Sequence, residues 1–229
     1  MNPVSLRKAA RRGLADEAAD RIRDAILGGH FPPGSAVREV ELAADLGVSR
    51  GSVREGLFLL EREGIVRSAW HRGTTVIEMT SADIEEVYSV RAALDRLAAT
   101  TAQARLTVAA SSAEMADLHA LVDQMATSIT AGATGPALLA LDLSFHDAIY
   151  AAAGNRRLTE AWQAIRSQTH FFQLHRVRLG FVHYRDRVVA EHREIAELLH
   201  HGTPEELAGV AEAHVHTARQ ELLTDLGRP

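Results

Sequence analysis

The chain has 229 residues, no cysteine and a formal net charge of −5 at pH 7, with 46% hydrophobic and 24% charged residues. A chain without cysteine cannot be a disulfide scaffold, a cysteine-ligated zinc protein, a thiol enzyme or an iron–sulfur protein. No apolar run approaches the roughly 18 residues of a membrane span, and no apolar segment follows the basic N-terminus as in a secretory signal, so we expect a cytoplasmic protein without membrane contact.

Charge and histidine content differ between two parts of the chain. Residues 1–79 carry 12 basic and 11 acidic residues, whereas residues 80–229 carry 13 and 19, together with ten of the 12 histidines. This asymmetry predicts two units with different partners. Residues 1–14 contain basic side chains and no acid, so we expect a flexible basic arm that is either a solvated tail or a contact to DNA phosphates.

Residues 15–79 show the pattern of a winged helix-turn-helix domain. Apolar residues at helical spacing are followed by two short β-like runs, which predict a hairpin wing. Gly47 supplies a tight turn between the second and third helix, and Ser49 can cap the third helix by accepting a free backbone N–H. The expected elements are helices over 15–28, 39–46 and 50–63 and strands over 65–68 and 74–77.

The third predicted helix carries the candidate DNA contacts. Arg50 and Arg54 are four residues apart and share the face opposite the apolar one. An arginine fork can bind guanine O6 and N7 or a phosphate. Isolated exposed arginines would be only solvated charge, but the helix-turn-helix spacing around them favours DNA contact. Further candidates are Ser49 and Ser52 in the first turn of the helix, and Arg72 and Gly73 in the wing.

Residues 47–51 also match the G-x-S-x-G pattern of a nucleophile elbow. That motif requires a strand before the serine, whereas the pattern of residues 41–46 is helical. We therefore interpret Ser49 as a helix cap and not as a nucleophile.

Several short motifs follow one another in this unit: Pro33-Gly34, Glu41-Leu42-Ala43, Gly47-Val48-Ser49-Arg50, Val53-Arg54-Glu55, Leu60-Glu61, Glu63-Gly64-Ile65-Val66 and Arg72-Gly73. In this order they resemble the DNA-binding domain of GntR-superfamily transcription regulators, over about residues 15–77. The resemblance implies binding to double-stranded DNA. Many members have threonine or proline at Gly51 and Ser52, and some have arginine at Val40, where Arg38 is our candidate to replace the contact.

Residues 80–229 have almost no strand signal and predict an antiparallel all-α bundle, because short loops between long amphipathic helices favour antiparallel neighbours. With the winged helix-turn-helix, this makes the expected fold mainly α. The expected helices span 81–106, 112–131, 136–153, 156–179, 183–201 and 204–226.

Four polar residues lie on the apolar faces of three of these helices: Asp142, His146, His192 and His214. A lone ionised Asp is costly to bury. A divalent metal held by one carboxylate and three imidazoles would satisfy all four groups and leave coordination positions open. An Asp–His hydrogen bond beside two buried neutral histidines explains the same pattern, so the residues alone leave both interpretations open.

The same region resembles the ligand-sensing domain of the FadR-like (FCD) branch. The resemblance is carried by residues 142–146, by Ala153-Gly154-Asn155, by residues 191–195 and by the segment 208–218. Members often hold a metal through one Asp and three His, and the matching positions here are Asp142, His146, His192 and His214. The resemblance therefore implies a divalent metal ion, with Zn expected first and Ni, Mn or Fe also compatible.

Arg91 lies on the inward stripe of the helix predicted over 81–106. A buried guanidinium needs an anion, which is either an internal partner such as Asp95 or the carboxylate of an effector that also reaches the metal. The resemblance implies a small organic acid as effector and an arginine near its pocket that matches Arg91. Asn155 either reaches this pocket or caps the following helix.

Together with these patterns, the two resemblances imply a ligand-responsive transcriptional regulator and not an enzyme. We expect a homodimer on a DNA operator, with repression relieved by a small carboxylate effector. One alternative is a metal-dependent hydrolase or lyase with a DNA-binding head, although no second acid lies at motif spacing to act as general base. Another is a regulator whose metal is purely structural, in which DNA affinity follows metal supply.

Overall fold

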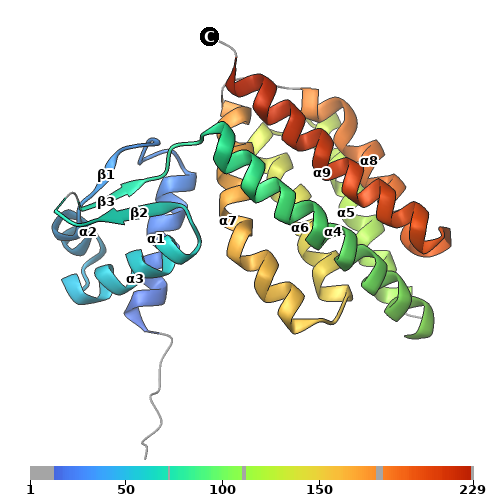
Figure 1. The fold of residues 1–229 in the computed structure, drawn as a ribbon, viewed down its shortest axis with the longest axis horizontal. Coiled ribbons are helices and arrows are strands. Elements are labelled where there is room, and N and C mark those ends of the chain that lie inside the picture. The colour runs from blue at the N-terminus through green and yellow to red at the C-terminus, as the bar shows by residue number, and fades with distance from the viewer. Residues whose placement is uncertain (1–12, 72, 110–111, 179–182, 228–229) are drawn as a thin grey trace, which may run out of the picture. The chain divides into compact units, whose positions relative to one another are not determined.

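The computed structural model describes residues 13–71, 73–109, 112–178 and 183–227 (Figure 1). These residues form two compact units, one ending at Glu78 and the other beginning at Met79. The predicted basic arm lies outside the described residues up to position 12, and its last residue, Leu14, is already the first residue of a helix. In the described ranges no helix is long and apolar enough to cross a membrane.

The N-terminal unit is a three-helix domain with a small antiparallel sheet, so the predicted winged helix-turn-helix is confirmed. One strand was missed: β1 has only two residues, too few to show an alternating pattern, and it pairs with β3 to give the strand order β1-β3-β2. The elements are α1 (Leu14–Leu27), β1 (Ala36–Val37), α2 (Glu39–Leu46), α3 (Arg50–Arg62), β2 (Val66–Ala69) and β3 (Gly73–Val76).

The turn between α2 and α3 forms as the sequence predicts. Gly47 ends α2 with a left-handed φ of 66°, a conformation that glycine adopts without strain. Ser49 begins α3, and its side chain accepts a hydrogen bond from the Ser52 backbone N–H at 3.1 Å. A Cβ at Gly56 would lie only 3.0 Å from backbone atoms of α1, so this glycine allows α3 to approach α1 closely.

The C-terminal unit is an all-α bundle, as predicted. Helices α4 and α9 lie side by side and run in opposite directions (Figure 1). Ion pairs from Arg96 to Glu212, at 2.9 Å, and from Arg219 to Glu85, at 3.1 Å, connect the two helices. The helices of the bundle are α4 (Ser81–Ala109), α5 (Ser112–Thr130), α6 (Gly135–Ala152), α7 (Arg156–Arg178), α8 (His183–His201) and α9 (Pro204–Leu226).

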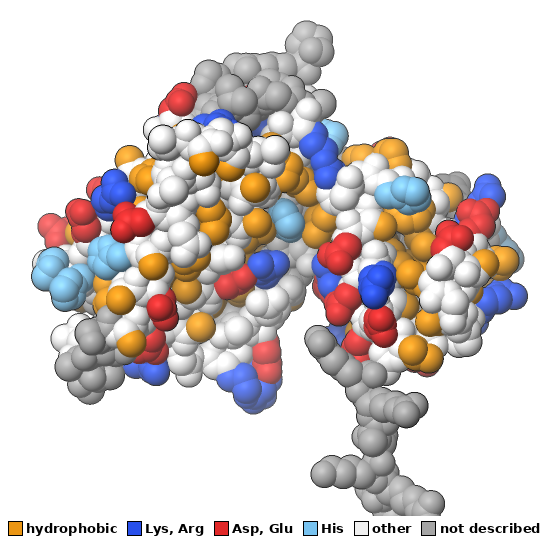
Figure 2. All heavy atoms as spheres, turned by 180° about the vertical axis from the view of Figure 1, so that it is seen from behind, with side chains coloured by type: hydrophobic (Ala, Val, Ile, Leu, Met, Phe, Trp, Pro, Cys, Tyr) orange, Lys and Arg blue, Asp and Glu red, His pale blue; other side chains and the backbone are white. Residues whose placement is uncertain are grey.

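Most charged side chains lie on the surface of the protein, but the interior of the bundle also holds a few. Figure 2 shows acidic and basic side chains interspersed over the visible face of each unit, with apolar side chains between them. The interior is apolar, but it also encloses polar side chains, and such groups are costly to bury unless they are paired or bind a ligand. Those that matter for the site are Arg91, Asp95, Asp142, His146 and His192.

Candidate metal centre and DNA-binding surface

Four side chains from α6, α8 and α9 converge in the interior of the bundle. They are Asp142, His146, His192 and His214, and one potential ligand atom from each lies within 4.8 Å of the others. Asp142, His146 and His192 are buried, and His214 is nearly so. The structure therefore brings together the four residues that periodicity placed on three separate helices.

Each of the three imidazole rings has its Nδ1 atom next to an oxygen acceptor. An Nδ1–H that faces an acceptor fixes the tautomer and leaves Nε2 unprotonated, which is the form that ligates a metal. The acceptors are the Val188 carbonyl oxygen at 2.7 Å from His192, Glu191 Oε2 at 3.1 Å from His214, and Asp95 Oδ2 at 3.4 Å from His146.

The Nε2 atom of His192 faces the Asp142 carboxylate. It lies 2.8 Å from Asp142 Oδ1, but the two atoms do not have hydrogen-bonding geometry. Because Nδ1 of His192 faces a carbonyl, a neutral ring carries its lone pair on Nε2. That lone pair and those of Asp142 Oδ1 repel each other at this distance unless a metal ion lies between them or Nε2 is protonated.

The electrostatics of the cluster favour the protonation states that metal ligands need. Burial alone would raise the pKa of the Asp142 carboxyl, but His192, His146 and Arg91 together hold it well below its usual range. Burial and the nearby Arg91 hold the pKa of His146 well below its usual range. The site thus combines an ionised carboxylate with a neutral imidazole, and this donor set suits Zn, Ni, Mn or Fe(II).

Arg91 of α4 lies beside this cluster and is only 2% exposed. Its Nη2 atom is 2.9 Å from His146 Nε2, and its Nε atom is 3.3 Å from Asp95 Oδ2. Its guanidinium also packs over the rings of Tyr88 and Trp162, at 5.6 and 5.7 Å. The predicted internal ion pair with Asp95 is therefore present, and it lies directly next to a candidate metal ligand.

A small cavity of about 10 Å³ lies beside the cluster. Its polar wall is formed by Asp95, His146, His214 and Tyr150, and the remaining wall is aliphatic. The Tyr150 hydroxyl donates to Asp95 Oδ1 at 2.6 Å. The cavity therefore places polar groups and candidate ligands around one space inside the bundle.

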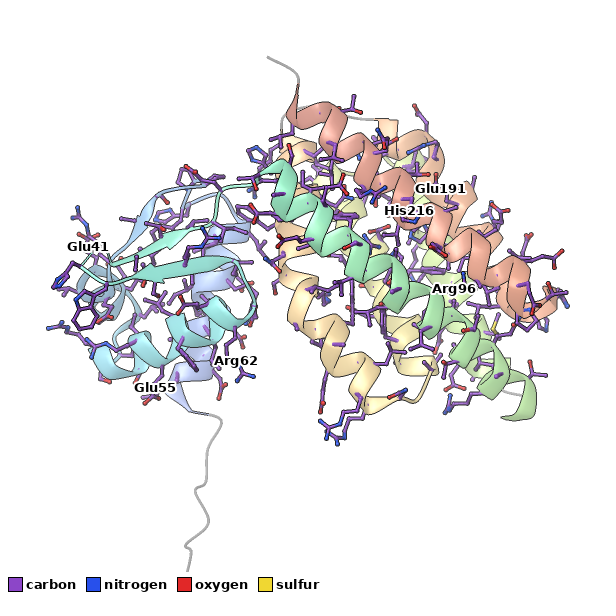
Figure 3. The ribbon with its side chains drawn as sticks, viewed as in Figure 1. Glu41, Glu55, Arg62, Arg96, Glu191 and His216 are labelled. Carbon is purple, nitrogen blue, oxygen red and sulfur yellow. The ribbon has the colours of Figure 1, made fainter. Side chains whose placement is uncertain are left out.

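The sequence did not predict that Glu191 contacts the candidate ligand His214 or that Tyr150 donates to Asp95. Glu191, labelled on α8 in Figure 3, directly precedes His192 in sequence but contacts His214 of α9. Its position next to a candidate ligand was the only signal in the sequence. The contact itself depends on how α8 and α9 pack, which periodicity does not give.

Asn155 takes the capping role and does not reach the cavity. Its Oδ1 atom accepts hydrogen bonds from the backbone N–H groups of Arg157 and Leu158, at 3.1 and 3.2 Å, and the residue is exposed. Gly154 precedes it with a left-handed φ of 63°, which directs the chain into α7. Of the two roles that the sequence left open for Asn155, the structure shows the capping of α7.

The candidate DNA-binding residues of α2 and α3 lie at the surface. Arg54 donates two hydrogen bonds to Glu39 of α2, at 3.1 and 2.8 Å. Arg38 is similarly paired with Glu41, at 2.9 Å. In the part of the chain that the structure describes, Arg50 and Arg62 of α3 are exposed and form no ion pair, and Arg50 is the one at the N-terminal end of the helix.

Near the start of α3, Ser49 and Ser52 have their hydroxyl oxygens 2.9 Å apart at the surface. In the wing, Gly73 begins β3 with a left-handed φ of 76°, whereas Arg72 lies outside the described residues. Trp70 is 87% exposed in the turn of the hairpin.

Comparisons with known proteins agree with both units. Residues 86–217 match the FCD domain, and residues 14–76 match the family described as bacterial regulatory proteins, gntR family. An uncharacterized HTH-type transcriptional regulator of Bacillus subtilis, YdhC, is 26% identical over 78% of this chain and 77% of its own. A probable D-xylose utilization operon transcriptional repressor of Paenarthrobacter nicotinovorans is 30% identical over 69% of this chain and 68% of its own.

A solved structure, E. coli McbR/YncC, has the same fold, with a TM-score of 0.78, 17% identity and coverage of 95% of this chain and 100% of its own. The two sequence relatives are transcriptional regulators by name and not enzymes. The chain therefore belongs to the gntR family of bacterial regulatory proteins and is a transcriptional regulator with an N-terminal helix-turn-helix domain and a C-terminal FCD domain.

Proposed function

We propose that this regulator binds a double-stranded DNA operator as a homodimer and senses a small carboxylate at a divalent metal held by Asp142, His146, His192 and His214. The observation that carries the metal site is the convergence of one potential ligand atom from each of these four residues within 4.8 Å, with His192 Nε2 only 2.8 Å from Asp142 Oδ1. Zn is our first expectation, and Ni, Mn or Fe would accept the same ligands.

Arg91 would bind the carboxylate of the effector. Its Nη2 atom lies 2.9 Å from His146 Nε2. An anion bound to the guanidinium would therefore also lie next to a metal held by His146. A bound metal would supply an open coordination position for one carboxylate oxygen. A fork of N–H donors beside that position favours a planar carboxylate over a neutral ligand.

On the DNA side, α3 would enter the major groove with its N-terminal end. Arg50 would contact a base edge or a phosphate, with phosphate contacts from Ser49 and Ser52 fixing the register. Arg54 and Arg38 would contribute where DNA phosphates replace their carboxylate partners on α2. Arg72 and Gly73 of the wing remain candidates for a second contact.

The bundle offers a face for a second copy of the chain. Val90 and Leu97 of α4 are 49% and 50% exposed, and with exposed Ala93 between them they follow the spacing of a helix–helix seam. A dimer through α4 would carry two helix-turn-helix domains, as a pseudo-palindromic operator requires. Two copies would act on DNA in the cytoplasm.

Effector binding would change DNA affinity by favouring one arrangement of the bundle, and the coupling free energy is limited to the effector's differential affinity, about 1–3 kcal/mol. Repression relieved by the effector is the direction we propose, and one relative is named a repressor. A regulator with a purely structural metal would instead respond to metal and ignore organic acids.

The test is fluorescence anisotropy with the intergenic DNA upstream of the gene, at fixed salt, with and without Zn2+ and a panel of small carboxylates. We expect binding at least a hundredfold tighter than to random DNA of equal length, and weaker binding with one of the carboxylates. An affinity equal to that for random DNA would overturn the operator proposal. If operator binding responds to Zn2+ and to none of the carboxylates, the protein is a metal-responsive regulator and the effector proposal fails.

A further inference from the structure

We propose that Asp95 is a positioning residue that couples the metal ligand His146 to the anion-binding Arg91. The inference rests on the proposed metal centre and goes beyond it, because it assigns a role to a residue that is neither a metal ligand nor an effector contact. Its consequence is that Arg91 and the metal ligand His146 compete for one carboxylate oxygen of Asp95.

The two oxygens of Asp95 have different surroundings. Oδ1 accepts a short hydrogen bond from the Tyr150 hydroxyl, at 2.6 Å. Oδ2 lies 3.3 Å from Arg91 Nε and 3.4 Å from His146 Nδ1. Among the described residues, neither Oδ2 nor Arg91 Nε forms a hydrogen bond of good geometry, although both atoms are buried. One oxygen is thus shared between two N–H groups and fully satisfies neither.

The frame around Asp95 holds its Oδ1 atom in place, so the carboxylate can only pivot about that oxygen. The Tyr150 ring stacks on Trp162 with centroids 4.9 Å apart and an angle of 6° between the planes. Burial and the adjacent Asp95 raise the pKa of the Tyr150 phenol, so the hydroxyl remains a donor to Oδ1. Trp162 is fixed in turn by a hydrogen bond from its Nε1 to Asp147, at 2.7 Å.

A small rotation of the Asp95 carboxylate, with Oδ1 held by the Tyr150 hydroxyl, decides whether Oδ2 accepts a hydrogen bond from His146 Nδ1 or from Arg91 Nε. A bond to His146 Nδ1–H orients the ring and increases the basicity of Nε2, which strengthens metal binding. A bond to Arg91 Nε instead holds the guanidinium. An anion bound to Arg91 neutralises the charge of the guanidinium. Asp95 Oδ2 is then free to accept a hydrogen bond from His146 Nδ1–H. Metal and anion therefore assist each other through Asp95, in addition to any direct contact between them.

The experiment measures Zn2+ affinity of the full-length protein by competition with a chromophoric chelator, without any organic acid. Asp95→Asn should weaken Zn2+ binding by about 10–100-fold, the usual effect of losing a carboxylate that supports a metal-bound histidine. Arg91→Met should tighten Zn2+ binding, because it frees Oδ2 for His146 and removes a positive charge. In the double variant the gain from Arg91→Met should be smaller than in the wild type.

Asp117→Asn is the control, since it removes the same charge from an exposed position on α5, outside the frame around Asp95. Its Zn2+ affinity should stay within about twofold of the wild type. Tyr150→Phe keeps the charge of Asp95 and loses only the bond to Oδ1, so it should give a smaller loss than Asp95→Asn. It also replaces that variant if Asp95→Asn does not fold.

The outcomes separate the two proposals. If the wild type does not bind Zn2+, the metal centre fails and the role of Asp95 fails with it. If the wild type binds Zn2+ and Asp95→Asn or Tyr150→Phe binds equally well, the metal centre stands and only the inference is overturned. Strictly additive effects of Asp95→Asn and Arg91→Met would likewise show that the two residues do not communicate.

Discussion

His192 Nε2 and Asp142 Oδ1 lie 2.8 Å apart in the buried centre of the bundle, while Nδ1 of the same imidazole is engaged by the Val188 carbonyl, 2.7 Å away. For a neutral His192 this arrangement excludes an ordinary Asp–His hydrogen bond and favours a metal ion, because the only N–H of the ring faces the Val188 carbonyl. A doubly protonated ring would also resolve the contact, and metal content distinguishes the two cases.

We expect about one divalent metal per chain in the wild type and little or none in His192→Ala, because removing one ligand of four breaks the coordination shell. The measurement is elemental mass spectrometry on protein purified without a histidine tag. His201→Ala, at an exposed position on the same helix, should retain the metal. A wild type that takes up no metal even after loading would make the four residues an internal polar network.

Arg50→Ala should weaken operator binding by about 1–3 kcal/mol if Arg50 contacts a base. Arg62→Ala is the control, since Arg62 is exposed at the far end of the same helix (Figure 3). A loss that is equal on operator and random DNA, with a shallower salt dependence, would indicate a phosphate contact instead. Equal affinities of the wild type and Arg50→Ala would remove Arg50 from the DNA-binding surface.

Trp70 should report contact between the wing and DNA. It is 87% exposed, whereas Trp162 is fully buried in the bundle, so a quencher such as acrylamide acts mainly on Trp70. We expect operator DNA to protect this emission, and Trp70→Phe to abolish the protected signal while retaining the fold. Unchanged quenching at saturating DNA would place the wing tip outside the complex.

His170 should remain neutral at pH values where an ordinary histidine is charged. Burial, assisted by Arg166 and Arg178, lowers its pKa to about 4. Below a pKa of about 6.5 the unfolded chain gains a proton that the folded protein does not bind, so this residue makes the fold less stable as pH falls from about 6.5 to 4 and adds nothing further below that range.

NMR titration of the His170 ring gives the midpoint directly. Unfolding experiments should show that His170→Gln reduces the fall in stability over the same interval, by at most about 1.4 kcal/mol per pH unit. The exposed His201→Gln should leave the slope unchanged. A midpoint near 6.5 for His170 would contradict the burial seen here.

Leu97→Asp should convert a dimer into monomers, because a charge in the centre of an apolar seam is costly to bury. Sedimentation velocity measures this directly, and operator binding should weaken in parallel. Asp123, which is exposed on α5, offers the control Asp123→Ala, with no effect on assembly. A Leu97→Asp variant that remains dimeric would move the interface away from this face of α4.

The amino-acid sequence by itself determined most of the local structure. Apolar spacing located the helices to within a few residues, and Gly47 with Ser49 marked the turn of the helix-turn-helix, because local sterics and backbone capping depend on neighbouring residues only. Periodicity also placed Asp142, His146, His192 and His214 on inward faces, since a helix fixes which residues share a face.

Only the tertiary structure decided how groups on different helices meet. Periodicity does not give the rotation and offset between packed helices, so it could not show that Glu191 supports His214 or that Asp95 stands between Arg91 and His146. These contacts are set by packing over a few ångströms. For the same reason Asn155 remained ambiguous until the chain direction at Gly154 showed it capping α7.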